Sequence, residues 1–280
     1  MKYLVLGSSG QIGAALCEWL ESRGETVIPF DIVNGPREDL RTNDNAYLDR
    51  CVAECDLVYF LAFDVGGSRY LKKYQDTYEF LSNNLRIMEH GFGAIRKHGK
   101  PTIFASSQMA NMSYSSYGSL KAVGEHLAKA LGGLVVKFWN VYGIEHDLSK
   151  SHVITDFILK AREQRRIDML TDGTEERQML FAEDCSKCLH ILAKRYGEIP
   201  RDKPLHITSF SWSKIAEIAK IIADLHPGTS VVPGAAGDEV QRDKRNEPDK
   251  FILNYWKPET TLVNGIKRIA EHYGQPAEPR

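Results

Sequence analysis

The first half of the chain alternates short apolar runs with longer amphipathic stretches. The apolar runs predict β-strands at Lys2–Leu6, Thr26–Asp31, Leu57–Ala62, Thr102–Ala105 and Leu134–Trp139. The amphipathic stretches between them predict helices at Gln11–Arg23, Asn45–Glu54, Gln75–Lys97 and Tyr117–Leu131. Strands that are apolar at nearly every position indicate a parallel sheet covered by helices on both faces. The pattern therefore predicts an α/β fold with a doubly wound, Rossmann-type parallel sheet.

The pattern becomes less regular after Gly143. Helices are expected at Ile154–Arg165, Ala182–Arg195, Ser213–Leu225 and Leu262–Tyr273, separated by segments rich in glycine, proline and charge. We expect a large domain over residues 1–150 and a smaller C-terminal α/β lobe over residues 151–280, with some segments of this second part returning to the large domain. The tail Gln275–Arg280 is expected to be loosely held.

Charge and cysteine content narrow the class of protein. The formal net charge of −1 provides no global field that would hold the chain on nucleic acid or an anionic membrane. No apolar run is long enough to cross a bilayer, and the N-terminal one is too short for a signal peptide. Five cysteines, an odd number, suit a reducing compartment, so we expect a cytoplasmic protein. The pairs Cys51/Cys55 and Cys185/Cys188 have helical spacing and are interpreted as packed thiols, and no metal site is predicted.

A glycine-rich turn directly follows the first predicted strand. The run Gly7-Ser8-Ser9-Gly10-Gln11-Ile12-Gly13 opens a helix, so backbone N–H groups and the helix N-terminus can meet a pyrophosphate. Asp31 ends the second strand, where a carboxylate accepts hydrogen bonds from ribose hydroxyls and repels a 2′-phosphate. This favours NAD over NADP. Asp39, before Leu40, is placed to meet the adenine amino group, although a solvated loop carboxylate is an equally good interpretation.

Tyr117 and Lys121 form a YxxxK pair at the start of a predicted helix, which puts the phenol and the ammonium on one face. A nearby ammonium favours tyrosinate and would lower the tyrosine pKa, so that Tyr117 could take a hydroxyl proton. Ser107 follows the fourth strand, at the sheet edge where such folds bind ligands. A hydroxyl at this position can align the reacting oxygen.

These motifs together resemble the extended short-chain dehydrogenases/reductases, specifically the NAD-dependent sugar-nucleotide epimerase/dehydratase group. The resemblance runs almost end to end, through GSSGQIG, LVYFLA, Asn83-Asn84, FASSQ, YGSLK, KFWNVYG, DGTEERQMLFAED and KPETTLVNGI. It implies NAD held by Gly7, Gly10, Gly13 and Asp31, with Gln11, Ile12, Asp39, Leu40, Leu61, Ala62 and Asn84 beside it. It implies Tyr117 as base, Lys121 on the nicotinamide ribose and Ser107 as third member.

The resemblance also implies a nucleoside-diphosphate sugar as substrate, contacted by Ser107 and Gln108 and, at the diphosphate, by Asn140 and Arg177. A planar guanidinium fork suits a diphosphate, in agreement with that role for Arg177. A homodimer paired through the helices at Gln75–Lys97 and Tyr117–Leu131 is implied in the same way.

Several departures from the family limit the substrate and the reaction. Nine residues separate Ser107 from Tyr117, fewer than usual, so the sugar pocket is expected to be unusual or more open. Gln108 and Met109 replace the Asp-Glu pair of dehydratases, which argues against dehydration. A second diphosphate arginine is absent before Asp238, where Arg242 or Arg245 could substitute or be solvated loop residues. Gly66-Gly67 resembles epimerases and reductases of GDP-sugars, and His146 and His152 flank the entrance to the second lobe.

The leading hypothesis is 4-epimerisation of a nucleoside-diphosphate sugar through a transient keto-sugar, with tightly held NAD. A sugar-nucleotide 4-dehydrogenase or a keto-sugar reductase would use the same three residues. A non-catalytic NAD-binding sensor is the alternative from another class, and the presence of all three residues speaks against it.

Overall fold

A parallel sheet forms the centre of the large domain. The computed structural model describes residues 1–237 and 246–274, and within them six strands pair in the order β2-β1-β3-β4-β5-β9, all parallel. These strands are β1 (Lys2–Leu6), β2 (Thr26–Phe30), β3 (Leu57–Phe60), β4 (Thr102–Ser107), β5 (Leu134–Phe138) and β9 (Leu205–Ile207). The strand order reverses between β1 and β3, which opens a crevice at the carboxyl ends of the strands. The predicted doubly wound α/β fold is confirmed.

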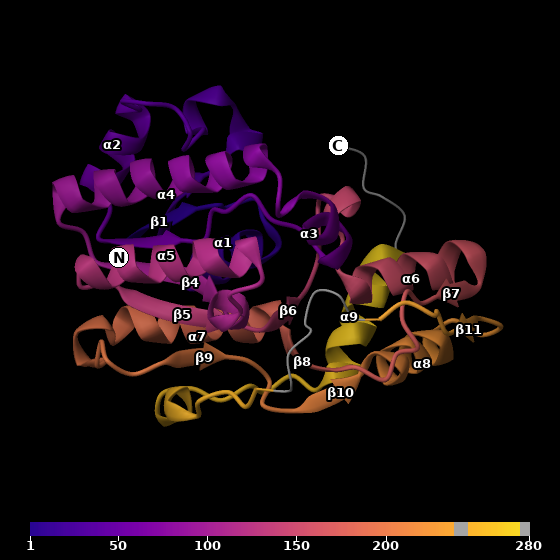
Figure 1. Cartoon of the computed structure of the whole chain (residues 1–280). Coiled ribbons are helices and arrows are strands. Elements are labelled where there is room, and N and C mark those ends of the chain that lie inside the picture. Colours follow the sequence, from indigo (N-terminus) through magenta and orange to yellow (C-terminus); the bar gives the residue numbers. More distant parts are fainter. Residues whose placement is uncertain (238–245, 275–280) are drawn as a thin grey trace.

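Helices cover both faces of this sheet (Figure 1). α1 (Gln11–Ser22) and α7 (Ala182–Lys194) pack on one face, and α2 (Ala46–Glu54), α4 (Tyr78–His98) and α5 (Ser116–Ala130) on the other. Alternate residues of each strand face opposite sides. In β1, Tyr3 and Val5 belong to the first core and Leu4 and Leu6 to the second. This explains why the strands are apolar at most positions.

Side-chain caps set the helix boundaries. Thr77 accepts a hydrogen bond from the Phe80 N–H, so α4 begins at Tyr78 rather than at the expected Gln75. The preceding residues form a separate helix, α3 (Ser68–Tyr74), which the sequence analysis missed. The helix expected from Ser213 begins at Ile215, because Trp212–Lys214 is strand β10. The other expected helices are found with ends that differ by at most one residue.

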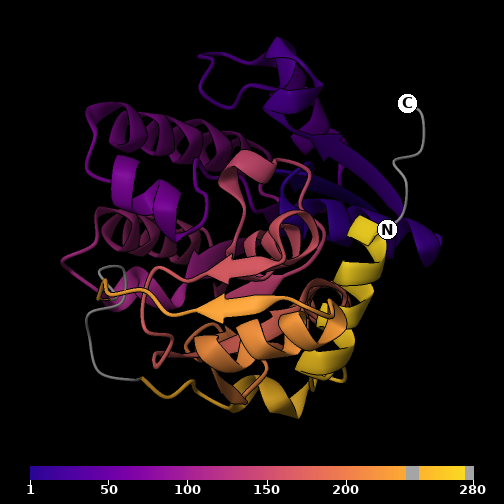
Figure 2. The ribbon, with the colours of Figure 1, turned by 90° about the vertical axis from the view of Figure 1, so that its right-hand side faces the viewer.

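The second lobe has its own sheets and core (Figure 2). Strands β6 (Asn140–Tyr142), β8 (Glu176–Phe181) and β10 form one sheet, and β7 (Arg166–Asp168) pairs with β11 (Ser230–Val232). The lobe core lies between these strands and α6 (Val153–Gln164), α8 (Ile215–Leu225) and α9 (Leu262–Gly274). From the second half of the sequence, α7 and β9 return to the large domain, where β9 pairs with β5.

Short 3-10 helices complete the described chain: η1 (Ile32–Asn34), η2 (Pro36–Glu38), η3 (Gln108–Asn111), η4 (Leu148–Lys150), η5 (Tyr196–Glu198) and η6 (Phe251–Asn254). Among the described residues, no helix combines the length and apolar character needed to span a membrane. All five cysteines are free, and the CxxC pair on α7 is buried in the large-domain core, as expected of packed thiols. Arg242, Arg245 and the tail Gln275–Arg280 lie outside the described residues.

Candidate active site

A cavity of about 1170 Å³ runs along the carboxyl edge of the large sheet and into the second lobe. Its wall begins at the glycine turn after β1, passes the ends of β3 and β4, and continues to the second-lobe strands β7 and β8. Most of the predicted site residues meet there: Gly7, Gly10, Gln11, Ile12, Gly13, Asp31, Asp39, Leu40, Leu61, Ala62, Ser107, Gln108, Tyr117, Lys121, Asn140 and Arg177.

The glycine turn is shaped by close backbone approach. Gly7 has φ +88°, and a Cβ on Gly13 would lie 2.0 Å from the Gly7 carbonyl oxygen, so neither position accepts a side chain. Gly10 differs from both, because a Cβ there would meet only the Gly7 oxygen, at 3.5 Å. Gly10 is the N-cap of α1 and lines the cavity, so its missing side chain leaves the helix N-terminus open to a phosphate. The turn therefore fits a dinucleotide pyrophosphate.

Two carboxylates lie beyond the glycine turn. Asp31 ends the extended segment after β2 and accepts hydrogen bonds from the Ser9 N–H at 3.0 Å and the Val33 N–H at 3.1 Å. Each carboxylate oxygen has a second lone pair, so Asp31 keeps acceptor capacity for ribose hydroxyls. Asp39 is held in a two-pronged pair by Arg41, at 2.8 Å for each prong, and this hydrogen bonding lowers the pKa of the Asp39 carboxyl. Its predicted contact with adenine stays a prediction.

Ser107, Tyr117 and Lys121 converge at the end of β4. Ser107 is the last residue of that strand, and Tyr117 and Lys121 lie one turn apart on α5. The Ser107 hydroxyl accepts from the Met109 N–H at 3.1 Å, and the Ser107 side chain lies near enough to Tyr117 to lower its pKa. Lys121 Nζ donates to the Ala105 carbonyl oxygen at 2.7 Å and lies 3.9 Å from the centre of the Phe63 ring.

The protonation properties of this cluster differ from the expectation. Burial raises the pKa of Tyr117 to about 12, and the Ser107 side chain partly offsets this rise. Burial lowers the pKa of Lys121 to about 7. Lys121 Nζ donates to a neutral carbonyl and lies 5.9 Å from the centre of the Tyr117 ring, and burial outweighs the lowering of the tyrosine pKa that was expected from this lysine. Instead the two groups have pKa values that burial moves toward their neutral forms.

The segment that follows β3 forms the cavity wall beside Tyr117. Phe63 packs edge-on against the Tyr117 ring with centroids 5.6 Å apart. Asn84 lies behind this wall, fully buried: it donates to the carbonyl oxygens of Asp64 and Phe80 and accepts from the Asp64 N–H. Its side-chain donors are used in these bonds, so the structure places Asn84 as support for the Phe63–Asp64 backbone. Its neighbour Asn83 lines the cavity.

The short segment between Ser107 and Tyr117 packs closely against α5. η3 carries Gln108 and Met109, both buried, and a Cβ on Gly118 would lie 2.1 Å from the Met109 carbonyl oxygen. Lys137 Nζ holds the Asn111 side-chain oxygen at 3.1 Å at the end of the turn. The shortened loop is thus a compact turn on α5, and Gln108 and Met109 form part of the cavity wall.

The second-lobe wall contains alternate residues of one strand. Arg177 and Met179 of β8 line the cavity together with Glu175, just before the strand, while Asn140 of β6 is in register with Met179. Asn140 Nδ2 donates to the Gln178 carbonyl oxygen at 3.5 Å, and Arg177 donates to the Glu176 carbonyl oxygen at 2.8 Å. The two predicted diphosphate contacts therefore lie on the same side of the cavity.

Other cavity residues were not identified as site residues from sequence. Asp64 accepts hydrogen bonds from the Tyr70 hydroxyl at 2.6 Å and from Asn83 at 3.2 Å. His152, noted from sequence only as an entrance residue, pairs through Nδ1 with the buried carboxylate of Glu145 at 2.6 Å. Both clusters combine residues from separate segments, so spacing along the chain gave no signal for them.

The fold and this arrangement define a dinucleotide-binding enzyme of the extended short-chain dehydrogenase/reductase type. A model of the NAD dependent epimerase/dehydratase family matches residues 3–207, and the chain belongs to this family. The resemblance inferred from sequence is thereby confirmed, and with it NAD as the cofactor and sugar-nucleotide epimerase/dehydratase as the class of enzyme.

Two curated relatives illustrate the range within the family. A GDP-L-fucose synthase of Sinorhizobium fredii (strain NBRC 101917 / NGR234) is 30% identical over 143 residues, which is 48% of this chain and 44% of that protein. An uncharacterized UDP-glucose epimerase of Bacillus subtilis (strain 168) is 25% identical, over 95% of this chain and 96% of the relative. The chain thus spans less than half the length of the first relative and nearly all of the second.

Solved structures show the same fold. An epimerase of Methanothermobacter thermautotrophicus has a TM-score of 0.85 at 19% identity, covering 98% of this chain and 92% of that one. A UDP-glucose 4-epimerase from Thermotoga maritima, solved with UDP-glucose, has a TM-score of 0.80 at 18% identity, covering 98% and 99%. At these identities the likeness establishes the fold alone.

Proposed function

We propose that the protein interconverts C4 epimers of a nucleoside-diphosphate sugar. The observation that carries this proposal is the convergence of Ser107, Tyr117 and Lys121 on one cavity that reaches without interruption from the glycine turn to Arg177. The end at the glycine turn suits a dinucleotide, and the end at Arg177 suits the diphosphate of a substrate. Ser107, Tyr117 and Lys121 lie between them, where a substrate hydroxyl could react.

Each residue has a proposed role in this reaction. The turn Gly7–Gly13, with Gln11 and Ile12 in it, holds the pyrophosphate of NAD; Asp31 takes the ribose hydroxyls, and Asp39, Leu40, Leu61 and Ala62 border the rest. NAD, when bound, accepts a hydride from the sugar carbon and returns it. Arg177 and Asn140 bind the substrate diphosphate, Gln108 borders the sugar, and Lys121 holds the nicotinamide ribose.

Tyr117 performs the proton transfer. The positive charge of bound NAD would have to favour the phenolate against the effect of burial. The phenolate oxygen then takes the C4 hydroxyl proton during oxidation and returns it when the keto-sugar is reduced on its other face. Ser107 aligns the reacting oxygen through its hydroxyl. A bound substrate would displace water from this part of the cavity, which strengthens the electrostatic contacts that it makes there.

Dehydration is disfavoured by the residues on η3. The positions after Ser107 hold Gln108 and Met109, and neither an amide nor a thioether can exchange protons in the way an acid pair does. Ser107, Tyr117 and Lys121 would serve an epimerase, a 4-dehydrogenase and a keto-sugar reductase alike. The dehydrogenase would release the keto-sugar that the epimerase retains, and the reductase would start from a keto-sugar.

We also propose the division into an NAD-binding domain over residues 1–150 and a mainly substrate-binding lobe over residues 151–280, with α7 and β9 returning to the large sheet. A homodimer paired through α4 and α5 is supported by exposed apolar side chains on both helices: Tyr78 and Leu85 on α4, Val123 and Leu127 on α5. Leu85→Glu should then halve the mass measured by sedimentation. A cytoplasmic location is supported by the five free thiols.

The reaction is tested by incubating purified protein with a panel of sugar nucleotides while following both the sugar products and the absorbance of free NADH. Conversion of one epimer into the other without net NADH is the expected result. Accumulation of NADH with a keto-sugar would replace epimerase by dehydrogenase. Absence of any conversion, together with unchanged cellular function of Tyr117→Phe, would favour the sensor instead.

A further inference from the structure

The strand that carries Arg177 also carries a carboxylate farther from the reaction centre. Side chains two residues apart on a strand point to the same face and lie about 6.7 Å apart along it. Met179, Arg177 and Glu175 follow this rule, and all three line the cavity while Glu176 and Gln178 do not. Met179 is in register with Asn140, which lies two residues after Phe138, and Phe138 is in register with Ser107. The series therefore runs outward from the reaction centre, and Glu175 lies one step beyond Arg177.

The Glu175 carboxylate is fixed in place. Its backbone carbonyl oxygen accepts from the Ile215 N–H at 3.1 Å, which extends the β8–β10 ladder by one residue. Its Oε1 accepts from the Thr171 hydroxyl at 2.5 Å, and Thr171 also lines the cavity. One bond to a hydroxyl leaves acceptor capacity on both carboxylate oxygens.

An apolar wall lies next to this carboxylate. Met169 and Leu170 directly precede Thr171 and line the cavity, together with Ala236 and Gly237. The Ala236 N–H bonds the Leu170 carbonyl oxygen at 3.1 Å, which fixes the backbone on this side. The Leu170 side chain is 53% exposed, a large apolar surface for a residue that lines a cavity. A flat aromatic ring placed against it would cover that surface.

We propose that this region binds the nucleobase of the substrate and that Glu175 selects guanine. The proposal rests on the function proposed above and specifies its substrate as a GDP-sugar. An ionised carboxylate only accepts hydrogen bonds. Guanine offers it two adjacent donors, the N1–H and the exocyclic amino group. Uracil and thymine offer a single N3–H between two carbonyl oxygens, which a carboxylate repels, and cytosine offers its amino group beside an acceptor nitrogen.

Titration calorimetry of the NAD-loaded protein with GDP, IDP and UDP tests the assignment. GDP should bind at least tenfold more tightly than UDP. IDP, which lacks the exocyclic amino group of guanine, should bind more weakly than GDP. Glu175→Gln should weaken GDP binding by tenfold or more, and UDP binding should stay the same or improve. Glu176→Gln, on the opposite face of β8, is the matched control and should leave all three affinities unchanged.

UDP binding as tight as that of GDP in the unmodified protein would overturn the base assignment, and this measurement needs no variant. Equal weakening of all three ligands by Glu175→Gln would overturn it as well. The two proposals fail separately. Selective GDP binding without conversion of any GDP-sugar would contradict the epimerase and support the base assignment. Conversion of a UDP-sugar in preference to GDP-sugars would support the epimerase and contradict the base assignment.

Discussion

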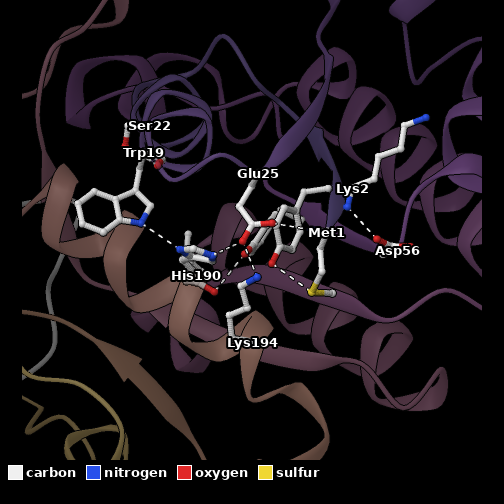
Figure 3. A network of polar contacts seen from close by, with 11 residues as sticks. Met1, Lys2, Trp19, Ser22, Glu25, Asp56, His190 and Lys194 are labelled. Atoms are coloured by element: carbon white, nitrogen blue, oxygen red, sulfur yellow. Dashed lines mark hydrogen bonds and ion pairs between the residues drawn. The ribbon is translucent and has the colours of Figure 1, made fainter.

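Two polar clusters lie at opposite edges of the same parallel sheet and differ in how their charges are matched. At the amino edge, Glu25 precedes β2 and receives the N-terminal ammonium at 2.6 Å, Lys194 and, at 3.3 Å, His190 (Figure 3). At the carboxyl edge, Tyr117 and Lys121 lie in the cavity beside a serine hydroxyl and a carbonyl oxygen.

The pKa values follow this difference. The hydrogen bond from Lys194 is the main reason that the pKa of Glu25 falls to about 2, so the amino-edge carboxylate is firmly charged. In the cavity, burial brings the pKa of Lys121 to about 7 and that of Tyr117 to about 12. At the amino edge, the ion pairs of Glu25 join the N-terminal ammonium and α7 to the start of β2. At the other edge burial favours the neutral form of both groups, and only Lys121 has a pKa close to neutral pH.

The largest expected effect comes from Tyr117→Phe, which removes the proposed proton carrier. Conversion of the substrate should fall by about 10³-fold, within the range typical of a lost general acid–base group. Tyr59→Phe is the matched control: Tyr59 is also buried, and its hydroxyl donates to the Leu189 carbonyl oxygen at 3.2 Å, outside the cavity. It should cost about 1 kcal/mol of stability and leave turnover unchanged. Turnover of Tyr117→Phe within tenfold of the unmodified protein would remove Tyr117 from the chemistry.

Lys121→Met should change the pH dependence of stability. The folded-state pKa of about 7 lies below the ordinary 10.5, so the unfolded chain binds more protons between these values. The free energy of unfolding of the unmodified protein should therefore rise with pH from about 7 to 10, by up to roughly 4 kcal/mol. The Lys121→Met variant lacks this rise. The free energy of unfolding of the variant minus that of the unmodified protein should therefore be most positive below pH 7 and decrease toward pH 10.

Urea unfolding at several pH values measures this difference, and Lys220→Met, an exposed lysine on α8, is the control. A difference between Lys121→Met and the unmodified protein that does not vary with pH would show that burial has not perturbed Lys121.

The cavity edge was largely predictable from sequence because its signals are local. The glycine turn depends on spacing within seven residues, and Tyr117 and Lys121 lie one helical turn apart, so each pattern carries its own chemistry. The pKa direction of Tyr117 was not predictable. Residue spacing places the lysine on the same helix face but does not show that Lys121 donates to the Ala105 carbonyl oxygen, or that the Phe63 ring contacts both Lys121 and Tyr117.

The amino-edge cluster had no sequence signal, since Glu25 and Lys194 are separated by most of the chain. Glu145 with His152 and Glu175 with Thr171 are close in sequence, but each pair lies in an irregular segment with no period that would show the contact. Helix α3 was missed for another reason: seven residues make about two turns, too few to show a helical period.

Glu25→Gln should lower stability and leave turnover intact. The amide removes the charge that joins the N-terminal ammonium, Lys194 and His190, so the melting temperature should fall by about 3 to 6 °C at neutral pH. The folded-state pKa is lowered, so this stabilisation is complete above pH 4.5 and should vanish as the pH falls toward 2. Thermal unfolding across this range measures it, and loss of turnover at neutral pH would contradict the separation of the two edges.

His190→Gln should give the smallest change. The Trp19 indole donates to Nδ1 of His190 at 3.3 Å, so the ring is neutral there and its Nε2–H donates to Glu25. Burial is the main reason that the pKa of His190 lies below 6.5. The unfolded chain then takes up this proton first, so the contribution of His190 to stability is complete above pH 6.5 and decreases as the pH falls below it. We expect a loss of about 1 to 3 °C in melting temperature at pH 8 and a smaller one at pH 5. A loss that grows on acidification would mean that His190 is charged in the folded state, and that the amino edge gains stability from a third cation rather than from a neutral bridge between Trp19 and Glu25.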